Sequence, residues 1–175
     1  CSGDVEDDDK ERALRPFKLG IALDVARAMA HCNNTEIFDP PLLHRDIKGD
    51  NVLMLSRTEA ETALNAGRGP WQAKLADFGE SRQLEKNQDH QGTMTMVGTA
   101  FWIAPEVYVG EHYDTACDVF SFGMLLLEMW LRESARYATM AQTMDYGTSA
   151  GTWPMKIHRG MRPSLAWLTL SAAQS

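Results

Sequence analysis

The chain has 175 residues, of which 44% are hydrophobic and 23% are charged, and its formal net charge is −7. This length supports one globular domain with a single core. The acidic balance argues against nucleic acid and against a polybasic membrane anchor, because both kinds of ligand require a basic face. The three cysteines, at positions 1, 32 and 117, contain no Cys-x-x-Cys pair. We therefore expect no disulfide scaffold and no cysteine zinc site, and a cytoplasmic (intracellular) location in a reducing compartment.

No stretch reaches the roughly 18 apolar residues that a membrane helix needs. The longest candidate, residues 120–131, is too short and contains Glu128. No secretory signal is visible. Because the first residue is Cys rather than Met, we expect the chain to be a fragment or a processed product.

The first predicted elements are an acidic segment and a helix. Residues 4–11 form an acidic run, which is typical of a solvated linker or a frayed helix start, and we assign residues 1–13 to an acidic linker. An amphipathic helix is predicted next, with a termination near residues 31–34, where two asparagines favour a cap or turn. Its apolar positions recur at spacings of three and four and are Leu14, Phe17, Ile21, Val25 and Met29.

The middle of the chain predicts a β-hairpin between polar segments. Pro40 and Pro41 break the chain ahead of a polar cluster at residues 44–51. Residues 52–55 and 71–76 are short strand candidates, and the polar stretch 56–72 reads as the loop between them. Residues 80–98 form a long polar segment, of a length that is often functional. Residues 118–131 are apolar on nearly all sides and predict a buried helix.

Three side chains suggest a site for phosphate chemistry. Asp46 and Asn51 lie in the polar cluster, and Asp77 directly follows the second strand candidate. Two carboxylates and an amide form a hard oxygen site suited to Mg²⁺, which also holds phosphate oxygens. Lys48 adds a mobile cation that can meet a phosphate. These groups are a reasonable inventory for phosphoryl transfer, in which the protein mainly positions groups and stabilises charge.

Three motifs then occur in a fixed order along the chain. The run His44-Arg45-Asp46-Ile47 with Asn51 matches the pattern H-R-D-L-x-x-x-N apart from the isoleucine, and Asp77-Phe78-Gly79 and Ala104-Pro105-Glu106 follow it. On these motifs the chain resembles the C-terminal lobe of a eukaryotic protein kinase, over about residues 14–163. The resemblance implies a protein kinase-like α+β fold, of which this chain would be the mainly α-helical lobe with short β-hairpins. Residues 164–175 would form an atypical tail.

The resemblance also implies a role for each matching residue. Asp46 would be the catalytic base that orients the acceptor hydroxyl, and Lys48 would steady the transferred phosphoryl group. Asn51 and Asp77 would hold magnesium. Leu53 would pack beneath the adenine ring of ATP, and Thr99 would bridge toward Asp46 and Lys48. The residue pattern of the chain is similar to that of the tyrosine-kinase-like branch. Lys48 points to serine or threonine as the acceptor.

Regulatory roles follow from the same resemblance. Arg45 would bind a phosphate on the activation segment, with Thr93 or Thr95 as candidate sites, although both are also read as ordinary loop threonines. His44 and Phe78 would stack together inside the lobe. Two further residues lie at the start of the predicted buried helix. Asp118 could cap that helix, brace the catalytic loop, or do both, and Cys117 reads as a small core residue.

The chain also departs from the family pattern. No G-x-G-x-x-G motif occurs in it, and the strand lysine of the smaller lobe has no counterpart, so we expect that lobe to be absent. We find no late arginine to pair with Glu106. The isolated chain is therefore expected to bind nucleotide weakly and to turn over little.

We thus interpret the chain as a fragment of a serine/threonine protein kinase, which uses ATP and Mg²⁺ to phosphorylate a protein substrate. The alternative is a non-catalytic remnant of the lobe that serves as a protein-binding module. The substrate, the pathway and the oligomeric state are open at this point.

Overall fold

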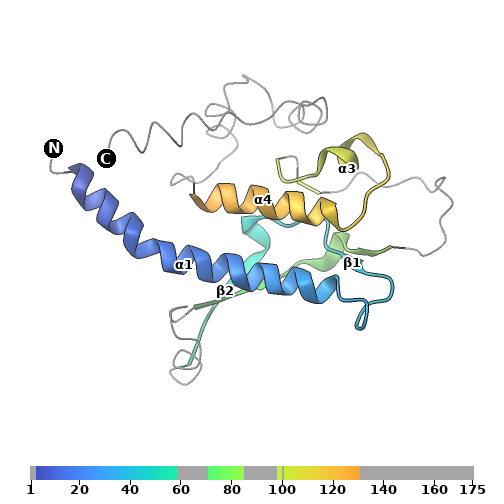
Figure 1. The fold of residues 1–175 in the computed structure, drawn as a ribbon, viewed down its shortest axis with the longest axis horizontal. Coiled ribbons are helices and arrows are strands. Elements are labelled where there is room, and N and C mark those ends of the chain that lie inside the picture. The colour runs from blue at the N-terminus through green and yellow to red at the C-terminus, as the bar shows by residue number, and fades with distance from the viewer. Residues whose placement is uncertain (1–2, 59–70, 85–97, 100, 131–175) are drawn as a thin grey trace.

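The computed structural model describes residues 3–58, 71–84, 98–99 and 101–130, and side chains from Arg12 onward. Two long helices dominate it. Helix α1 spans Gly3–Cys32 and helix α4 spans Ala116–Trp130. They lie side by side and run in opposite directions (Figure 1). The observed helices and short strands agree with the predicted α+β class.

Helix α1 begins earlier than the sequence suggested. It includes the acidic run, which the structure places in the helix rather than in a linker. Acidic residues are favourable in the first turns of a helix because they face the positive end of its dipole. The predicted end is confirmed: the last turn closes with a hydrogen bond from the Asn33 amide to the Met29 carbonyl at 2.9 Å. Val25 and Met29 are buried, whereas Leu14, at the start of the predicted stripe, is 46% exposed.

In the part of the chain that the structure describes, four strands form two small antiparallel sheets. Strands β2 (Val52–Ser56) and β3 (Trp71–Leu75) form the predicted hairpin, in which Val52 is paired with Leu75 and Ser56 with Trp71. Strands β1 (Leu42–Leu43) and β4 (Arg82–Gln83) form the second pair. The hairpin packs on α1 through β3. Because β1 precedes the polar cluster and β4 follows Asp77, the pairing of β1 with β4 places these two segments next to each other.

Short helical turns complete the described structure. A 3₁₀ turn covers Gly49–Asn51, a second covers Phe78–Glu80, and helix α3 spans Pro105–Val109. No helix among the described residues is long and apolar enough to cross a bilayer.

Helix α4 is buried on one face rather than on nearly all sides. Cys117, Ser121 and Leu125 recur every four residues and are at most 3% exposed, whereas Val119 is 57% exposed. An α-helix returns to the same face after three or four residues, so a neighbour on one side buries one stripe only. The prediction of an all-round buried helix was therefore wrong. The prediction that Cys117 is a core residue is confirmed, and burial raises the pKa of its thiol.

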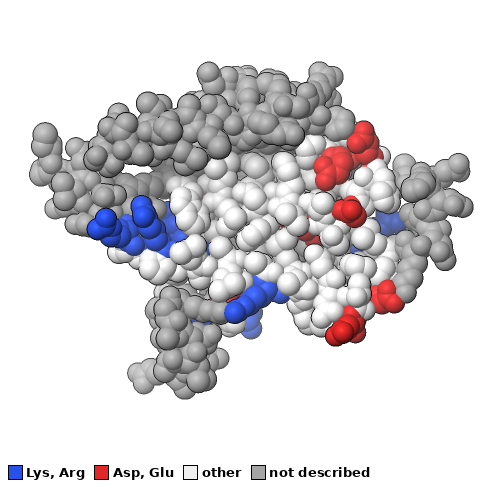
Figure 2. All heavy atoms as spheres, viewed as in Figure 1, with Lys and Arg blue, Asp and Glu red and all other residues white. Residues whose placement is uncertain are grey.

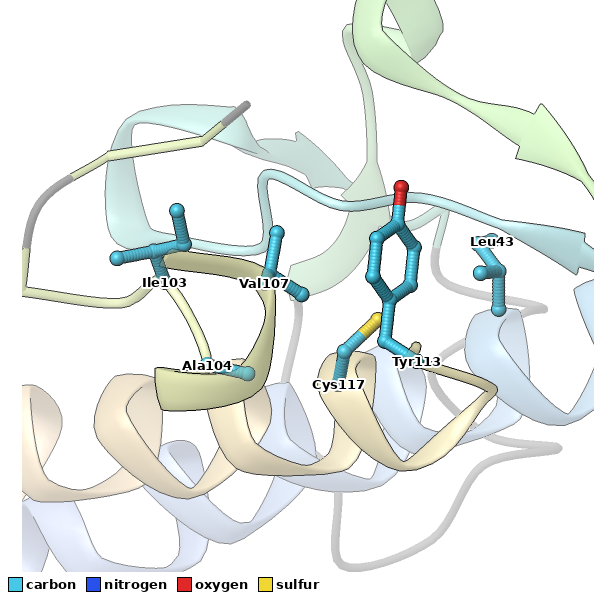
Figure 3. Close-up of a cluster of buried hydrophobic side chains, with 6 residues drawn as sticks. All are labelled: Leu43, Ile103, Ala104, Val107, Tyr113 and Cys117. Atoms are coloured by element: carbon cyan, nitrogen blue, oxygen red, sulfur yellow. The ribbon is translucent and has the colours of Figure 1, made fainter. Parts of the chain in front are cut away.

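Among the described residues, two buried clusters hold the elements together. The first joins β1, α3 and α4 (Figure 3), and its members are Leu43, Ile103, Ala104, Val107, Tyr113 and Cys117. The second joins α1, β3, α4 and the polar cluster, and its members are Val25, Met29, Ile47, Ala73 and Leu125. The segment that carries Asp46 thus runs between two apolar clusters.

Charged side chains are unevenly distributed on the face that Figure 2 shows. Lys and Arg side chains gather over the N-terminal half of α1, with others below the middle and at the right side, whereas Asp and Glu side chains lie at the opposite end, near α3 and at the lower edge. No continuous basic stripe runs across the described part of this face.

Candidate active site

The loop from His44 to Asn51 is named the catalytic loop here for the catalytic residues that the sequence analysis expects in it. One buried carboxylate anchors it to helix α4. Asp118 accepts hydrogen bonds from the backbone N–H groups of His44 at 2.7 Å and Arg45 at 2.8 Å. Burial raises the pKa of Asp118, against the lowering effect of these two donors. Between the two sequence readings of this residue, the structure favours the brace, because the α4 N-terminal amide of Ala116 is capped by Asp114 instead.

The ring of His44 is held on two sides. Its Nδ1 faces the Asp46 amide at 3.3 Å and its Nε2 faces the Ala76 carbonyl at 3.0 Å. A neutral imidazole protonated on Nε2 satisfies both contacts. The ring also meets Phe78 edge-on, with 4.7 Å between ring centroids. The sequence predicted that these two rings stack; they are in contact, but edge-on with an interplanar angle of 61°, and the contact joins the catalytic loop to the turn after Asp77.

Asp46 is the most constrained polar side chain of the loop. It is 9% exposed, and its carboxylate accepts hydrogen bonds from three side chains. Lys48 Nζ and Asn51 Nδ2 donate to Oδ2 at 2.6 and 2.9 Å, and the Thr99 hydroxyl donates to Oδ1 at 2.7 Å. Burial alone would raise the pKa of Asp46, but the three donors and the charge of Lys48 lower it overall. The carboxylate is therefore ionised and fixed in direction at neutral pH.

Thr99 links the catalytic loop to the segment 98–106. Its Oγ1 accepts a hydrogen bond from Lys48 Nζ at 2.7 Å while donating to Asp46. The predicted bridge is thus present as geometry. Gly98 allows this approach, because it has φ +113° and a Cβ there would lie 2.8 Å from the Arg45 carbonyl oxygen. Any larger residue would push the two segments apart.

Asn51 and Asp77 lie at the same end of the hairpin. The Asn51 carbonyl accepts a hydrogen bond from the amide of Ala76 at 2.9 Å, so the residue opposite Asn51 is the one that precedes Asp77. Asn51 uses its Nδ2 for the carbonyl and carboxylate of Asp46, at 2.7 and 2.9 Å. Its side-chain oxygen then receives no hydrogen bond from the described residues. The structure thereby places the two residues that the sequence assigned to magnesium at the same end of the hairpin.

Asp77 is exposed and has a left-handed backbone, with φ 60°. Its Oδ1 accepts a hydrogen bond from the Gly79 amide at 3.2 Å, which caps the 3₁₀ turn, and Oδ2 is left available within the described structure. One carboxylate oxygen and one amide oxygen on adjoining strand ends are the ligand type that Mg²⁺ prefers. The donor set therefore fits a magnesium-bound phosphate ligand.

Of the other predicted site residues, Leu53 and Arg45 lie in the described part of the structure. Leu53 lies on β2, is 55% exposed and is available for contact with a ring. The guanidinium of Arg45 contacts the Glu80 carbonyl and the Tyr113 hydroxyl. Thr93 and Thr95 lie outside the described residues.

One part of the site was missed by the sequence analysis. Glu128 on α4 accepts hydrogen bonds from the Gly49 amide at 3.3 Å and from Trp102 Nε1 at 3.2 Å. Burial and the charge of Asp50 raise the pKa of Glu128, against these two donors. A Cβ on Gly49 would lie 3.0 Å from this carboxylate. The signal was present in the sequence, because Glu128 interrupts an apolar stretch.

An ionised carboxylate and a lysine on a braced loop, with two oxygens of the type that Mg²⁺ prefers on neighbouring strand ends, are groups suited to phosphoryl transfer. The model of the protein kinase domain family matches residues 14–158, and the chain belongs to that family. This finding bears out the resemblance to a protein kinase domain.

Three relatives illustrate the similarity. A probable serine/threonine-protein kinase of Dictyostelium discoideum is 38% identical over 118 residues, which is 67% of this chain and 11% of the relative. A putative serine/threonine-protein kinase/receptor of Acanthamoeba polyphaga mimivirus is 36% identical over 112 residues, 64% of this chain and 6% of the relative. A probable LIM domain-containing serine/threonine-protein kinase of D. discoideum is 35% identical over 161 residues, 90% of this chain and 13% of the relative. The chain thus spans a small part of the length of these relatives.

Proposed function

We propose that this chain contributes the catalytic loop of a serine/threonine protein kinase of the tyrosine-kinase-like branch, which transfers the γ-phosphoryl group of ATP to a protein hydroxyl. The observation that carries the proposal is the arrangement around Asp46. Lys48, Asn51 and Thr99 fix the ionised carboxylate in one direction. Phosphoryl transfer needs positioning and charge stabilisation more than covalent chemistry from the protein.

Each side chain has a task that its contacts support. Asp46 accepts the hydrogen bond of the incoming hydroxyl and orients its oxygen. Because its pKa is lowered, it is a weak base, and it takes the proton only when transfer is well advanced. Lys48 carries a positive charge beside the reacting oxygens. Asn51 and Asp77 would hold magnesium, and Mg-ATP when bound supplies the phosphoryl group and further neutralising charge.

Serine and threonine are proposed as acceptors on two grounds. Lys48, the residue that the sequence analysis took as the sign of a serine or threonine acceptor, contacts Asp46 at 2.6 Å and Thr99 at 2.7 Å. The relatives named above also carry the serine/threonine description. Intracellular activity on a protein substrate belongs to the same proposal.

The decisive experiment measures phosphotransfer by the full-length protein with Mg-ATP and dephosphorylated casein, a general acceptor. Asp46→Asn should lower kcat by about a hundredfold or more, which is typical for loss of a general base. Asp114→Asn is the matched control, because asparagine also caps a helix and activity should be retained.

Two results would count against the proposal. Equal activity of the Asp46→Asn variant and the wild type would remove Asp46 from the chemistry. A folded wild-type protein with no phosphotransfer and no Mg-dependent nucleotide binding would instead favour the non-catalytic binding module.

A further inference from the structure

Arg45 is held in an unusual way for a cation next to a catalytic residue. It has a left-handed backbone, with φ 67°, and its amide is bound by Asp118. Its Nε donates to the Glu80 carbonyl at 2.6 Å and its Nη1 donates to the Tyr113 hydroxyl at 2.9 Å. Both acceptors are neutral, and within the described structure the guanidinium forms no ion pair. The direction of the guanidinium is thus set by two uncharged oxygens.

Tyr113 is a rigid acceptor. The residue is 2% exposed, and its ring packs in the cluster that joins β1, α3 and α4. Figure 3 shows the ring among Leu43, Val107 and Cys117, with its oxygen pointing out of the cluster. Packing therefore fixes the ring, and the hydroxyl is the part that reaches Arg45. A phenylalanine would keep the apolar contacts and lose this oxygen alone.

The second acceptor, Glu80, belongs to the turn that follows Asp77. The 3₁₀ turn Phe78–Glu80 has Asp77 as its N-cap. The Arg45 side chain therefore ties the backbone of this turn to the catalytic loop that carries Asp46. Tyr113, in the segment that connects α3 and α4, accepts the second hydrogen bond of the same guanidinium.

We propose that Tyr113 is a positioning residue for phosphoryl transfer. Its hydroxyl aims the Arg45 guanidinium at the Glu80 carbonyl and so fixes Asp46 and Asp77 relative to each other. This inference rests on the proposed function. A hydroxyl suits the task better than a carboxylate would, because it leaves the positive charge of Arg45 unneutralised. The guanidinium has five N–H donors, and the contacts with Glu80 and Tyr113 use two of them, so among the described residues the other donors stay available to a phosphate.

The test compares Tyr113→Phe with the wild type in the full-length protein. We expect kcat for casein phosphorylation to fall about tenfold, which corresponds to about 1.4 kcal/mol in the barrier. The KM for casein should change less than about twofold, because uniform binding is not altered. The melting temperature should stay within about 2 °C, since the ring remains packed. In ¹⁵N NMR spectra the Arg45 Nε–H signal should shift and exchange with water at least about tenfold faster.

Val107→Ala is the matched control. It perturbs the same cluster without touching a hydroxyl, so it should lower the melting temperature while leaving the Arg45 signal and kcat in place. Loss of kcat in this control would show that general destabilisation is the cause, and would overturn the inference.

The remaining outcomes separate the two proposals. A Tyr113→Phe protein with wild-type kcat, or with reduced kcat but an unchanged Arg45 signal, refutes the positioning role while leaving the kinase proposal intact. An inactive wild type refutes the kinase proposal itself, and the positioning role falls with it.

Discussion

Replacement of Ile47 by alanine tests whether the catalytic loop is also a structural part of the core. Ile47 lies between Asp46 and Lys48, is 0% exposed and packs in the cluster that joins α1, β3 and α4. Its neighbours Val25 and Leu125 are at most 2% exposed and belong to two different helices. Two helices that already pack together cannot easily collapse onto the space of three lost carbons.

The expected cost follows from this burial. Truncation of a buried isoleucine to alanine destabilises proteins by about 2–5 kcal/mol. Because the surrounding side chains cannot easily fill the cavity, we expect a loss of unfolding free energy of about 3 kcal/mol or more at this site. At about 2–4 °C per kcal/mol for a protein of this size, the melting temperature should fall by about 6–12 °C. Ile47→Val should cost only about 0.5–1.5 kcal/mol.

Urea unfolding followed by circular dichroism measures these differences. Val119→Ala is the matched control, because this aliphatic side chain is 57% exposed and alanine is the better helix former, so its effect should be close to zero. An Ile47→Ala protein within about 1 kcal/mol of the wild type would refute the reasoning. It would mean that the loop is supported by its polar contacts and not by the core.

Three further predictions concern polar contacts. Thr99→Val should lower kcat about tenfold and raise the pKa of Asp46, measured by NMR titration, whereas Thr99→Ser should retain both values. The raised pKa of Glu128 means that its protonated form favours the folded state, so this contribution is complete below its unfolded pKa and is lost as pH rises through the folded pKa. Glu128→Gln should therefore reduce the loss of unfolding free energy as pH rises from about 4 to 7. The unfolding free energy is measured by urea titration at each pH, and a dependence on pH equal to that of the wild type would contradict this. Asp24→Asn should cost about 3 kcal/mol, because Asp24 and Arg57 form a buried ion pair at 3.0 Å. A change below about 1 kcal/mol would show that the pair is dispensable.

Local signals in the sequence predicted much of the fold. The asparagines after residue 32 marked the end of α1, and apolar runs flanked by turn residues marked both strands of the hairpin. The position of Asp77 near Asn51 also agrees with local order, because the hairpin pairs Asn51 with Ala76, the residue directly before Asp77. These features depend on neighbours along the chain, which a single sequence displays.

Contacts between distant residues were not predictable in the same way. Asp118 and Arg45 are separated by 73 positions, and nothing local distinguishes a brace from a helix cap. The role of Tyr113 depends on which way a packed ring points, and the single buried face of α4 depends on which elements lie beside it. Tertiary packing decides such features, and periodicity reports only that a face exists.

The hairpin has a consequence for how this protein can change over evolutionary time. Asn51 and Asp77 lie at one end of β2 and β3, whereas the chain leaves β2 at Ser56 and re-enters β3 at Trp71 at the other end. Five residues of strand separate the two ends by about 17 Å. Closing a longer connection costs little free energy, and the Asp24–Arg57 pair secures the strands where that connection begins. Insertions between Ser56 and Trp71 can therefore accumulate, or a reporter can be placed there, while the geometry around Asp77 is preserved.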